Sequence, residues 1–172
     1  NFEKGKIYLT NIARHYENHK RLVGIIAATN KLNKEGYKFE VLFIGDGEDH
    51  KLYEDKIKEY NIKNIHLLGK KQNPYKYLKH SSALLLSSIR EGYPVVFIEA
   101  MVLNKPIITT NVSDAKIDIA NKFGIVVNND DNSIYDGMKE FIENGYEMKS
   151  KFNYEEFNKE IEEKVDVIYN KD

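Results

Sequence analysis

The stretch SALLLSSIREGYPVVFIEAMVLNKPIITT, residues 82–110, carries the strongest indication of the fold. Its two ends, 82–88 and 106–110, are short apolar runs of the kind that form strands buried on both faces. Between them, residues 94–103 have the length of a helix, begin with a proline and are apolar almost all round. A strand, a helix and a second strand in this order predict one unit of a parallel sheet, with a loop just before the helix.

The rest of the chain repeats this alternation of short apolar runs and longer amphipathic segments. The further predicted strands are 6–13, 38–47, 64–69 and 124–127, and the further helices are 20–36, 48–61, 73–81, about 114–121, 131–144 and 154–169. We therefore predict an α/β fold, a Rossmann-like doubly wound parallel sheet of about six strands.

Length and composition place limits on the class of protein. The 172 residues show no linker or repeat, so we expect 1–172 to be a single domain. A formal net charge of −1 gives no reason to expect a nucleic acid partner. The absence of cysteine excludes disulfides and thiolate chemistry and fits a cytoplasmic location. Because the chain begins with Asn1 instead of Met, we expect it to be part of a longer protein.

In a parallel α/β sheet, ligands bind at the carboxyl ends of the strands, which include the loop after 82–88. This loop contains Glu91 and Gly92, and Pro94 opens the helix. The first N–H groups of a helix lack internal partners and its dipole adds positive charge, so a phosphate group is a natural ligand there. Glu99 lies about 7.5 Å further along the axis, at 1.5 Å per residue, so two carboxylates flank this anion site.

A ligand with a diphosphate in the middle and hydroxyl groups on both sides suits this arrangement, and a nucleotide sugar is such a ligand. Glu91 would accept hydrogen bonds from the sugar, and Glu99 from the ribose. The alternative is that Glu99 is simply solvated at the helix surface. Without ligand, the nucleotide hypothesis expects Glu99 to face a cleft or to hold a substitute partner, because an unpaired buried carboxylate is costly.

Three cations follow the first predicted strand. Arg14 stands at its carboxyl end, and Lys20 and Arg21 stand where the next helix starts. Cations at the start of a helix oppose its dipole, and a bound anion would remove the conflict. The alternative is that all three are ordinary surface cations.

Two other features indicate sites less strongly. The segment GDGEDH, 45–50, lacks the third glycine of a dinucleotide-binding fingerprint, so we interpret Gly45 and Gly47 as turn glycines. His15 and His19 are four residues apart and could share a helix face, but no third ligand is evident and the other histidines are scattered. We therefore predict no metal site.

The segment EGYPVVFIEAM, 91–101, resembles the signature of the retaining GT-B glycosyltransferases of group 1, also called family four, which reads E-G-[FY]-[GP]-x-x-x-x-E-A-[ML]. The following KPIITT, 105–110, matches that family's K-P-[IV]-[IV]-[ST]-T. Segments 12–22, 42–49 and 64–88 also look like family segments in the family's order, so the resemblance covers about residues 6–127.

This resemblance implies the C-terminal, donor-binding half of a two-domain enzyme, with the N-terminal acceptor domain absent from this chain. Arg14 and Lys20 match the cations that hold the donor diphosphate; Glu91 matches the residue that holds the transferred sugar, and Glu99 the one that holds the ribose. The helix start and the loop beside the base complete the implied site with Gly92, Tyr93, Pro94, Val95, Val96, Lys70 and Lys71. The family needs no metal or other cofactor, and a nucleotide sugar is its co-substrate, for which we expect UDP rather than GDP.

The sequence departs from the family pattern at two places. Arg14 and Lys20 are six positions apart where five is more common, which leaves open an inserted residue or a part for Arg21. The paired glycines that follow the fifth strand in the family are replaced by Ser113 and Asp114, which puts a backbone contact to phosphate in doubt.

We therefore expect a hexosyltransferase domain for cell-surface or capsular polysaccharide synthesis, inactive in transfer on its own. The alternatives are a nucleotide-sugar epimerase, with His15 as the nearby acid–base group, a glycoside hydrolase, whose two carboxylates must flank one bond, and a non-catalytic nucleotide-binding module. The abundance of Lys, Asn, Ile and Tyr indicates an AT-rich bacterial genome. Peripheral association with the inner face of a membrane would come through the absent half.

Overall fold

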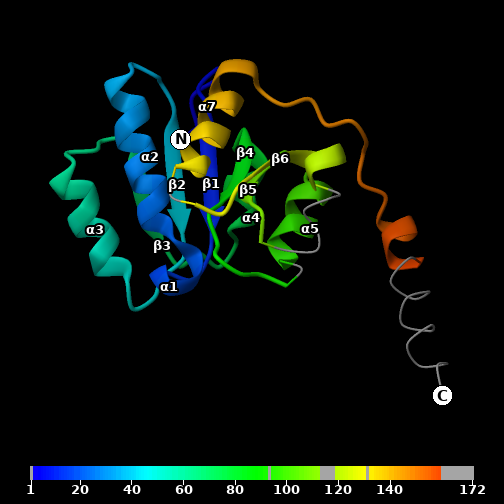
Figure 1. The fold of residues 1–172 in the computed structure, drawn as a ribbon. Helices are drawn as coiled ribbons and strands as arrows, with labels where there is room; N and C mark the ends of the chain where they lie inside the picture. Colours follow the sequence, from blue (N-terminus) through cyan, green and yellow to red (C-terminus); the bar gives the residue numbers. More distant parts are fainter. Residues whose placement is uncertain (1, 93, 113–118, 131, 160–172) are drawn as a thin grey trace.

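The computed structural model describes residues 2–92, 94–112, 119–130 and 132–159 (Figure 1). Its six strands form one sheet in the order β3-β2-β1-β4-β5-β6, and every pair of neighbours is parallel. The strands are β1 Tyr8–Ile12, β2 Glu40–Ile44, β3 Ile65–Gly69, β4 Ala83–Leu86, β5 Ile107–Thr110 and β6 Gly124–Val127. The prediction of a Rossmann-like parallel sheet of six strands is confirmed.

Helices cover both faces of this sheet (Figure 1). They are α1 Glu17–Lys20, α2 Leu22–Lys34, α3 His50–Glu59, α4 Tyr75–His80, α5 Val95–Val102 and α7 Ser133–Asn144, with a π-helical turn η1 at Ile119–Phe123. Helices α2, α3 and α7 pack on one face, and α4 and α5 pack on the other. This is the double winding that the alternating sequence predicts.

The apolar strands supply two cores, one on each face. In β4, Leu85 packs with the α2, α3 and α7 side, whereas Leu84 and Leu86 pack with α4 and α5. Successive side chains of a strand point to opposite faces, so a strand that is covered on both sides must be apolar at every position. All four residues of β4 are buried, which explains the continuous apolar run in the sequence.

The connection from β1 to α2 differs from the prediction of one continuous helix at 20–36. A short helix, α1, comes first, and the chain then turns at Arg21, whose φ of 49° lies in the left-handed region. The hydroxyl of Ser87 donates to the carbonyls of both Lys20 and Arg21, at 2.7 and 3.0 Å. These bonds hold the turn between α1 and α2, where the carbonyl of Arg21 also accepts a hydrogen bond of 3.1 Å from the N–H of Gly24.

Helix α5 is less covered than its sequence suggests. Val95 is 68% exposed and Val102 is 59% exposed, so a helix that is apolar almost all round in sequence is open to solvent on this side. Residues 95, 99 and 102 are spaced i, i+4 and i+7, which puts them on one stripe of the helix. The opposite stripe, with Phe97 and Met101, is buried.

Two predicted helices lie partly outside the described residues. Of the helix expected at about 114–121, only the end is described, and residues 119–123 form the π-helical turn. Of the helix expected at 154–169, residues 154–159 are described and are helical. Within the described ranges, no helix has both the length and the hydrophobicity that a membrane span requires.

The strand order reverses between β1 and β4, which are neighbours in the sheet although four helices and two strands separate them in the chain. From β1 the chain runs outward through β2 to β3, and from β4 it runs the other way through β5 to β6. The connections after β1 and β4 therefore diverge at the carboxyl end of the sheet, the position where open α/β sheets bind ligands, and we call this position the switch point.

Candidate functional site

Two of the predicted site residues meet across this switch point. The ammonium group of Lys20, at the end of α1, forms an ion pair with the Oε1 atom of Glu91, in the loop after β4. The hydroxyl of Ser88 donates a second hydrogen bond to the same carboxylate oxygen, at 2.7 Å. Both side chains of the pair are partly buried, so their charges are less screened than those of a surface pair.

Backbone contacts hold the two loops together around this pair. The N–H of Ile89 donates to the carbonyl of His19 at 2.8 Å, and the Ser87 hydroxyl binds the carbonyls at the end of α1. On the other side, the hydroxyl of Thr110, at the end of β5, donates to the carbonyl of Ser88 at 2.7 Å. The loop that carries Glu91 is thus fixed to both neighbouring connections.

The start of α2 already holds an anion from the protein itself. The carboxylate of Glu17 accepts a hydrogen bond from the N–H of Val23, at 3.2 Å. This carboxylate lies at the positive end of α2, where it offsets the unfavourable position of Lys20 and Arg21. Burial raises the pKa of Glu17, and the hydrogen bond from Val23 opposes this shift. The unfavourable interaction between these cations and the helix dipole, which suggested a bound anion, is therefore offset by a carboxylate of the protein itself.

The start of α5 stays available to a ligand. Pro94 precedes the helix in an extended conformation, and among the described residues no side chain caps it. The N–H of Phe97 donates to the carbonyl of Pro94 at 2.9 Å, so the N–H groups ahead of it, on Val95 and Val96, have no partner within the helix. Gly92 is exposed. The predicted contact from Tyr93 lies outside the described residues, as do the departures at Ser113 and Asp114.

Glu99 holds a substitute partner, as expected for a structure without ligand. Its Oε1 atom accepts a hydrogen bond of 2.7 Å from the hydroxyl of Tyr75, the first residue of α4. This bond to the carboxylate raises the pKa of Tyr75. Because Glu99 lies on the same stripe as the exposed Val95 and Val102, it is only partly buried and can exchange Tyr75 for another donor.

The remaining predicted cations line a groove of about 460 Å³ at the carboxyl ends of β1, β2 and β3. Arg14, Lys70 and Lys71 form its charged part, together with Asp46. The guanidinium of Arg14 pairs with Glu48 at 3.5 Å, and both side chains are exposed. Arg14 and Lys20 therefore do not share one anion here, since each has its own carboxylate partner.

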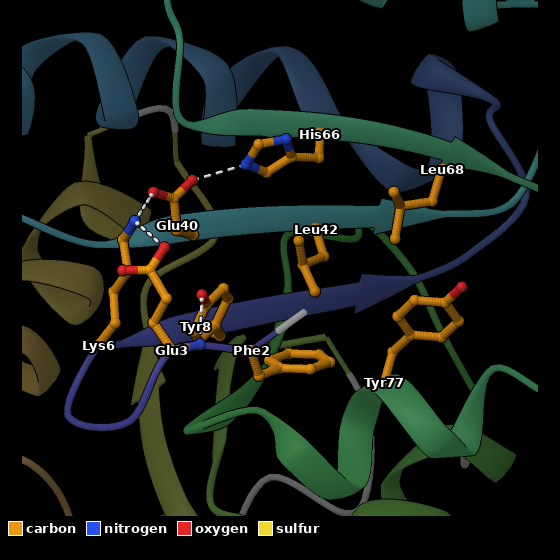
Figure 2. Close-up of a pocket in the computed structure, with 9 residues that line it drawn as sticks. All are labelled: Phe2, Glu3, Lys6, Tyr8, Glu40, Leu42, His66, Leu68 and Tyr77. Atoms are coloured by element: carbon orange, nitrogen blue, oxygen red, sulfur yellow. Dashed lines mark hydrogen bonds and ion pairs between the residues drawn. The ribbon is translucent and has the colours of Figure 1, made fainter.

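A second hollow, on the sheet face beside α4, contains none of the predicted site residues (Figure 2). Its apolar wall comes from Phe2, Tyr8, Leu42, Leu68 and Tyr77. At its edge, the carboxylate of Glu40 binds Lys6 at 2.7 Å and His66 at 2.6 Å. This hollow lies on the face of β1, β2 and β3 and away from the switch point, so we interpret it as a feature of packing.

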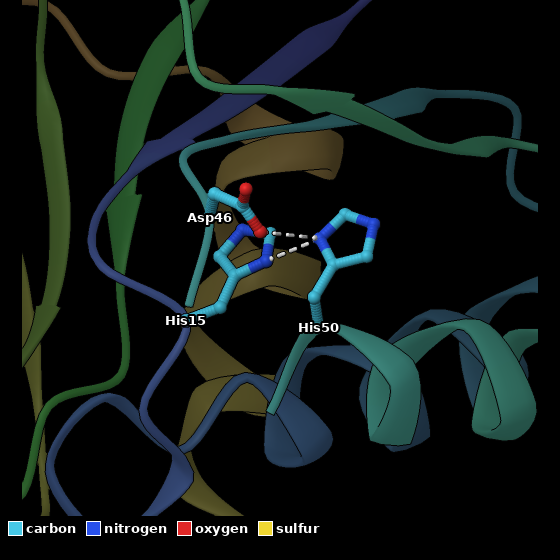
Figure 3. Close-up of side chains that lie close together, drawn as sticks. All are labelled: His15, Asp46 and His50. Carbon is cyan, nitrogen blue, oxygen red and sulfur yellow. Dashed lines mark hydrogen bonds and ion pairs between the residues drawn. The ribbon is translucent and has the colours of Figure 1, made fainter. Parts of the chain in front are cut away.

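Sequence reasoning missed a contact between histidines. His15 does not pair with His19, which stacks on Tyr16 instead. His15 lies against His50 from the start of α3, with their Nδ1 atoms 2.8 Å apart and their rings stacked (Figure 3). The description of the other histidines as scattered is therefore wrong for His50. Burial, and then His50, lower the pKa of His15, whereas Asp46 raises it.

The predicted residues thus fall into two groups. Lys20, Glu91 and the start of α5 surround the switch point, and Arg14, Lys70 and Lys71 line the neighbouring groove. Glu99 is connected to the groove side through Tyr75, whose neighbour Pro74 lines the groove. Together these groups provide cations, free N–H groups and carboxylates along one edge of the sheet, a set that suits an extended ligand with anionic and hydroxyl groups.

Comparison with known proteins identifies the class. Residues 1–159 match the model of the family described as glycosyl transferases group 1, so the chain belongs to this family. An uncharacterised glycosyltransferase of Methanocaldococcus jannaschii is 34% identical over 112 residues, which cover 64% of this chain and 27% of that protein. The chain spans about a third or less of the length of this relative and of a relative from Campylobacter jejuni.

A relative with a stated reaction is similarly distant. The 4-alpha-N-acetylgalactosaminyltransferase of Campylobacter jejuni that acts on a diphospho-undecaprenol-linked sugar is 30% identical over 112 residues, which cover 60% of this chain and 31% of that protein. Among solved structures, a TarM mutant of S. aureus in complex with UDP has a TM-score of 0.71 at 20% identity, covering 84% of this chain and 31% of that one. This likeness shows the fold, a GT-B domain.

Proposed function

We propose that this chain is the nucleotide-sugar-binding domain of a retaining glycosyltransferase that transfers a hexose from a nucleoside diphosphate to an acceptor hydroxyl. The observation that carries the proposal is the Lys20–Glu91 pair across the switch point, directly ahead of the open start of α5. A cation, a carboxylate and free N–H groups meet there, and they complement a phosphate that is bonded to a sugar.

Donor binding would replace the contacts within the protein by contacts to the ligand. Lys20 would move from Glu91 to the diphosphate, and Glu91 would then accept hydrogen bonds from sugar hydroxyls while Ser88 still holds its carboxylate. Glu99 would exchange the Tyr75 hydroxyl for the ribose. Each exchange keeps a charged group paired, so binding does not require an isolated buried charge.

Catalysis in this scheme is electrostatic. As the bond between sugar and phosphate breaks, negative charge develops on the leaving diphosphate. In this scheme the cations Lys20 and Arg14 and the N–H groups at the start of α5 would stabilise that charge without a divalent ion. Arg14 must leave Glu48 to take part, which its exposed position allows.

The finer parts of the proposal have indirect support. TarM, of the same fold, is in complex with UDP, and we take UDP as the first nucleotide to test. The name of the Campylobacter relative states an alpha-linked product, which retention gives from an alpha-linked donor. That relative acts on a lipid-linked sugar, which agrees with a role in cell-surface glycans and with work at the cytoplasmic side of a membrane through the acceptor half.

An epimerase has less support because His15 is poorly placed for it. Its ring is fully buried, and its Nδ1 atom is occupied by His50. An acid or base that acts on a bound sugar must come within hydrogen-bond reach of the reacting group. A non-catalytic nucleotide-binding module would use the same residues, so the transfer assay of the full-length protein separates it from the enzyme.

The proposal is tested by amide NMR titration of the chain with UDP and with GDP. We expect UDP to shift signals of residues 14–20, 70–71 and 91–99. The variant Lys20→Ala should weaken UDP binding by about tenfold or more, the loss of one charge-assisted contact of about 1.5–3 kcal/mol. Lys51→Ala is the matched control, since Lys51 also pairs with a carboxylate, at 2.8 Å to Asp55, but is not among the residues assigned to the donor.

Two results would contradict the proposal. One is that neither nucleotide shifts the signals of 14–20 or 91–99. The other is that Lys20→Ala and Lys51→Ala weaken UDP binding equally, because binding would then depend on overall charge rather than on the switch point.

A further inference from the structure

His15, Asp46 and His50 form a cluster that the proposed donor site does not use (Figure 3). They come from three places along the chain: the loop after β1, the loop after β2 and the first turn of α3. The two Nδ1 atoms are 2.8 Å apart, and the Oδ1 atom of Asp46 is 3.6 Å from the Nδ1 of His50. All three possible ligand atoms lie within 4.8 Å of one another.

The backbone around this cluster is tightly constrained. The N–H of His15 donates to the carbonyl of Asp46 at 3.0 Å, and the N–H of Asp49 donates to the carbonyl of His15 at 3.2 Å. The loops approach so closely that a Cβ atom on Gly45 would lie 1.8 Å from the Ala13 carbonyl oxygen. Side chains on such a frame hold their separation, which is the requirement for a metal site with defined geometry.

We propose that His15, His50 and Asp46 bind one divalent transition-metal ion, with two imidazole nitrogens and one carboxylate oxygen as ligands. At metal–nitrogen bonds of about 2.0–2.1 Å, two nitrogens 2.8 Å apart subtend an angle of about 85–90° at the ion. This angle belongs to square-planar or octahedral coordination, whereas tetrahedral zinc needs a wider one. The Oδ1 atom of Asp46, 3.6 Å from the Nδ1 of His50, would subtend a wider angle of about 115–130°, so the two distances together do not select one metal. We choose Cu²⁺ as the probe because it binds nitrogen and oxygen ligands most strongly among the divalent first-row ions.

The surroundings of the cluster suit a cation. Asp46 is 64% exposed and the His50 side chain 27% exposed, so an ion and its remaining water ligands can enter from solvent. The carboxylate of Glu54 lies 3.7 Å from the other ring nitrogen of His50, which is longer than a hydrogen bond, so Glu54 adds negative charge beside the cluster. Glu48 and Asp49 add negative charge to the same loop.

The cluster adjoins the groove that contains Arg14, since Asp46 lines that groove too. A bound ion would join the loops after β1 and β2 at the edge of the sheet. The proposal goes beyond donor binding and does not depend on it, and its test uses no nucleotide. Its failure would therefore leave the proposed function untouched.

The test is a titration of the chain with Cu²⁺ alone, followed by amide NMR and electron paramagnetic resonance. We expect one site of higher affinity than the rest, with signals of residues 13–16 and 45–50 broadened first and a spectrum that indicates two nitrogen ligands. His50→Gln should weaken this site at least about tenfold, because loss of even an outer partner of a metal ligand costs 10- to 100-fold. Asp46→Asn should weaken it as well.

His66→Gln is the matched control, because His66 also binds a carboxylate, Glu40, but has no second histidine beside it. It should leave the Cu²⁺ affinity unchanged. Thermal unfolding by circular dichroism shows whether each variant is folded. Two results would overturn the proposal: equal Cu²⁺ affinity of the original chain and of folded His50→Gln, or amide signals outside residues 13–16 and 45–50 that broaden first. In either case the two rings would be a hydrogen-bonded pair only.

Discussion

Glu99 shows how one side chain can be suited to both an empty and an occupied site. A carboxylate in an apolar helix needs a partner, and Tyr75 supplies it at 2.7 Å. The partner is a neutral hydroxyl on a neighbouring short helix, and the carboxylate lies on the exposed stripe of α5. Glu99 therefore has a hydrogen-bond partner without a buried counter-ion, and under the proposed function it would exchange this partner for a ribose hydroxyl.

We expect Glu99→Gln to weaken UDP binding by about 10- to 100-fold, the loss of a charge-assisted hydrogen bond of about 1.5–3 kcal/mol. Binding of inorganic phosphate should hardly change, because Glu99 is assigned to the ribose and not to the diphosphate. Calorimetric titration with both ligands measures the two losses.

The control for this experiment is Tyr75→Phe, which removes only the present partner of Glu99. It should leave UDP affinity equal or slightly higher. Equal losses of UDP and phosphate affinity in Glu99→Gln would show that Glu99 does not contact the ribose.

Gly47 is needed for a different reason, the close approach of two loops. A Cβ atom at this position would lie 2.4 Å from the carbonyl oxygen of His15, a backbone atom that cannot move away without its loop. Gly47 is thus required for the close approach of the loops, whereas a positive φ occurs at Gly45, at 148°. We expect Gly47→Ala to lower the free energy of unfolding by about 1–3 kcal/mol, as overpacking does.

Gly92→Ala provides the comparison, since nothing lies within 4 Å of a Cβ atom there. Its free energy of unfolding should stay within about 0.5 kcal/mol of the original, as for most surface substitutions. Urea denaturation of the two variants side by side measures both. A Gly47→Ala protein as stable as Gly92→Ala would mean that the two loops are not held as close as the structure places them.

At the scale of elements, Glu40 ties together the strands at one side of the sheet (Figure 2). Its carboxylate, at the start of β2, binds Lys6 ahead of β1 and His66 in β3. Burial raises the pKa of Glu40, but the bonds from Lys6 and His66 outweigh it, so the pKa lies below its ordinary value of 4.5. A lowered pKa means that the stabilisation is present above pH 4.5 and is lost as the pH falls through the folded-state value.

We therefore expect Glu40→Gln to lower the midpoint of thermal unfolding at pH 7 by about 2–4 °C. The difference from the original chain should shrink as the pH falls below about 4.5, where the carboxylate of the original also becomes protonated. Circular dichroism melts over a pH series measure this.

Glu3→Gln is a suitable control because Glu3 contacts the same Lys6, at 3.5 Å, but is 73% exposed, against 13% for Glu40. A surface pair of this kind contributes little. If the two variants lose the same stability, or if the effect of Glu40→Gln grows at low pH, the role assigned to Glu40 is wrong.

The elements themselves were largely predictable because their patterns are local. Continuous apolar runs such as 82–88 identify strands covered on both faces, and the glycine at 92 and the proline at 94 mark the start of α5. The break at Arg21 was not predictable, because it depends on bonds from Ser87, which lies 66 positions away in the chain. The exposed stripe of α5 has a similar cause, since exposure depends on which elements cover a helix and not on its own residues.

The candidate site was also predictable where its pattern is local in the sequence, but not where it depends on contacts between distant segments. The motif at 91–101 and the rule of strand ends directed attention to Lys20, Glu91 and Glu99, and the structure brings Lys20 to Glu91. The pairing of Arg14 with Glu48 and of His15 with His50 did not follow, because each joins loops that only the parallel pairing of β1 with β2 places together.

At the scale of the whole molecule, the switch point divides the sheet into two halves, β1 to β3 and β4 to β6, and the proposed donor lies across both. The first half supplies Arg14, Lys20 and the groove, and the second supplies Glu91 and α5. A ligand that needs both halves can be recognised by this domain alone. We assign no residue of this chain to the acceptor of the proposed reaction. The chain spans 27–37% of the length of three curated relatives.

From this arrangement we expect the 172-residue chain to bind UDP but to transfer no sugar, whereas the full-length protein should do both. Incubation with radiolabelled UDP-sugars and a lipid-linked acceptor measures transfer, and NMR of the anomeric proton of the product reports retention. The control measures whether the chain alone hydrolyses UDP-sugars to UDP and free sugar without an acceptor. Transfer by the isolated chain would show that the acceptor site lies within it, and a full-length protein that binds UDP-sugars without transfer would favour the binding module.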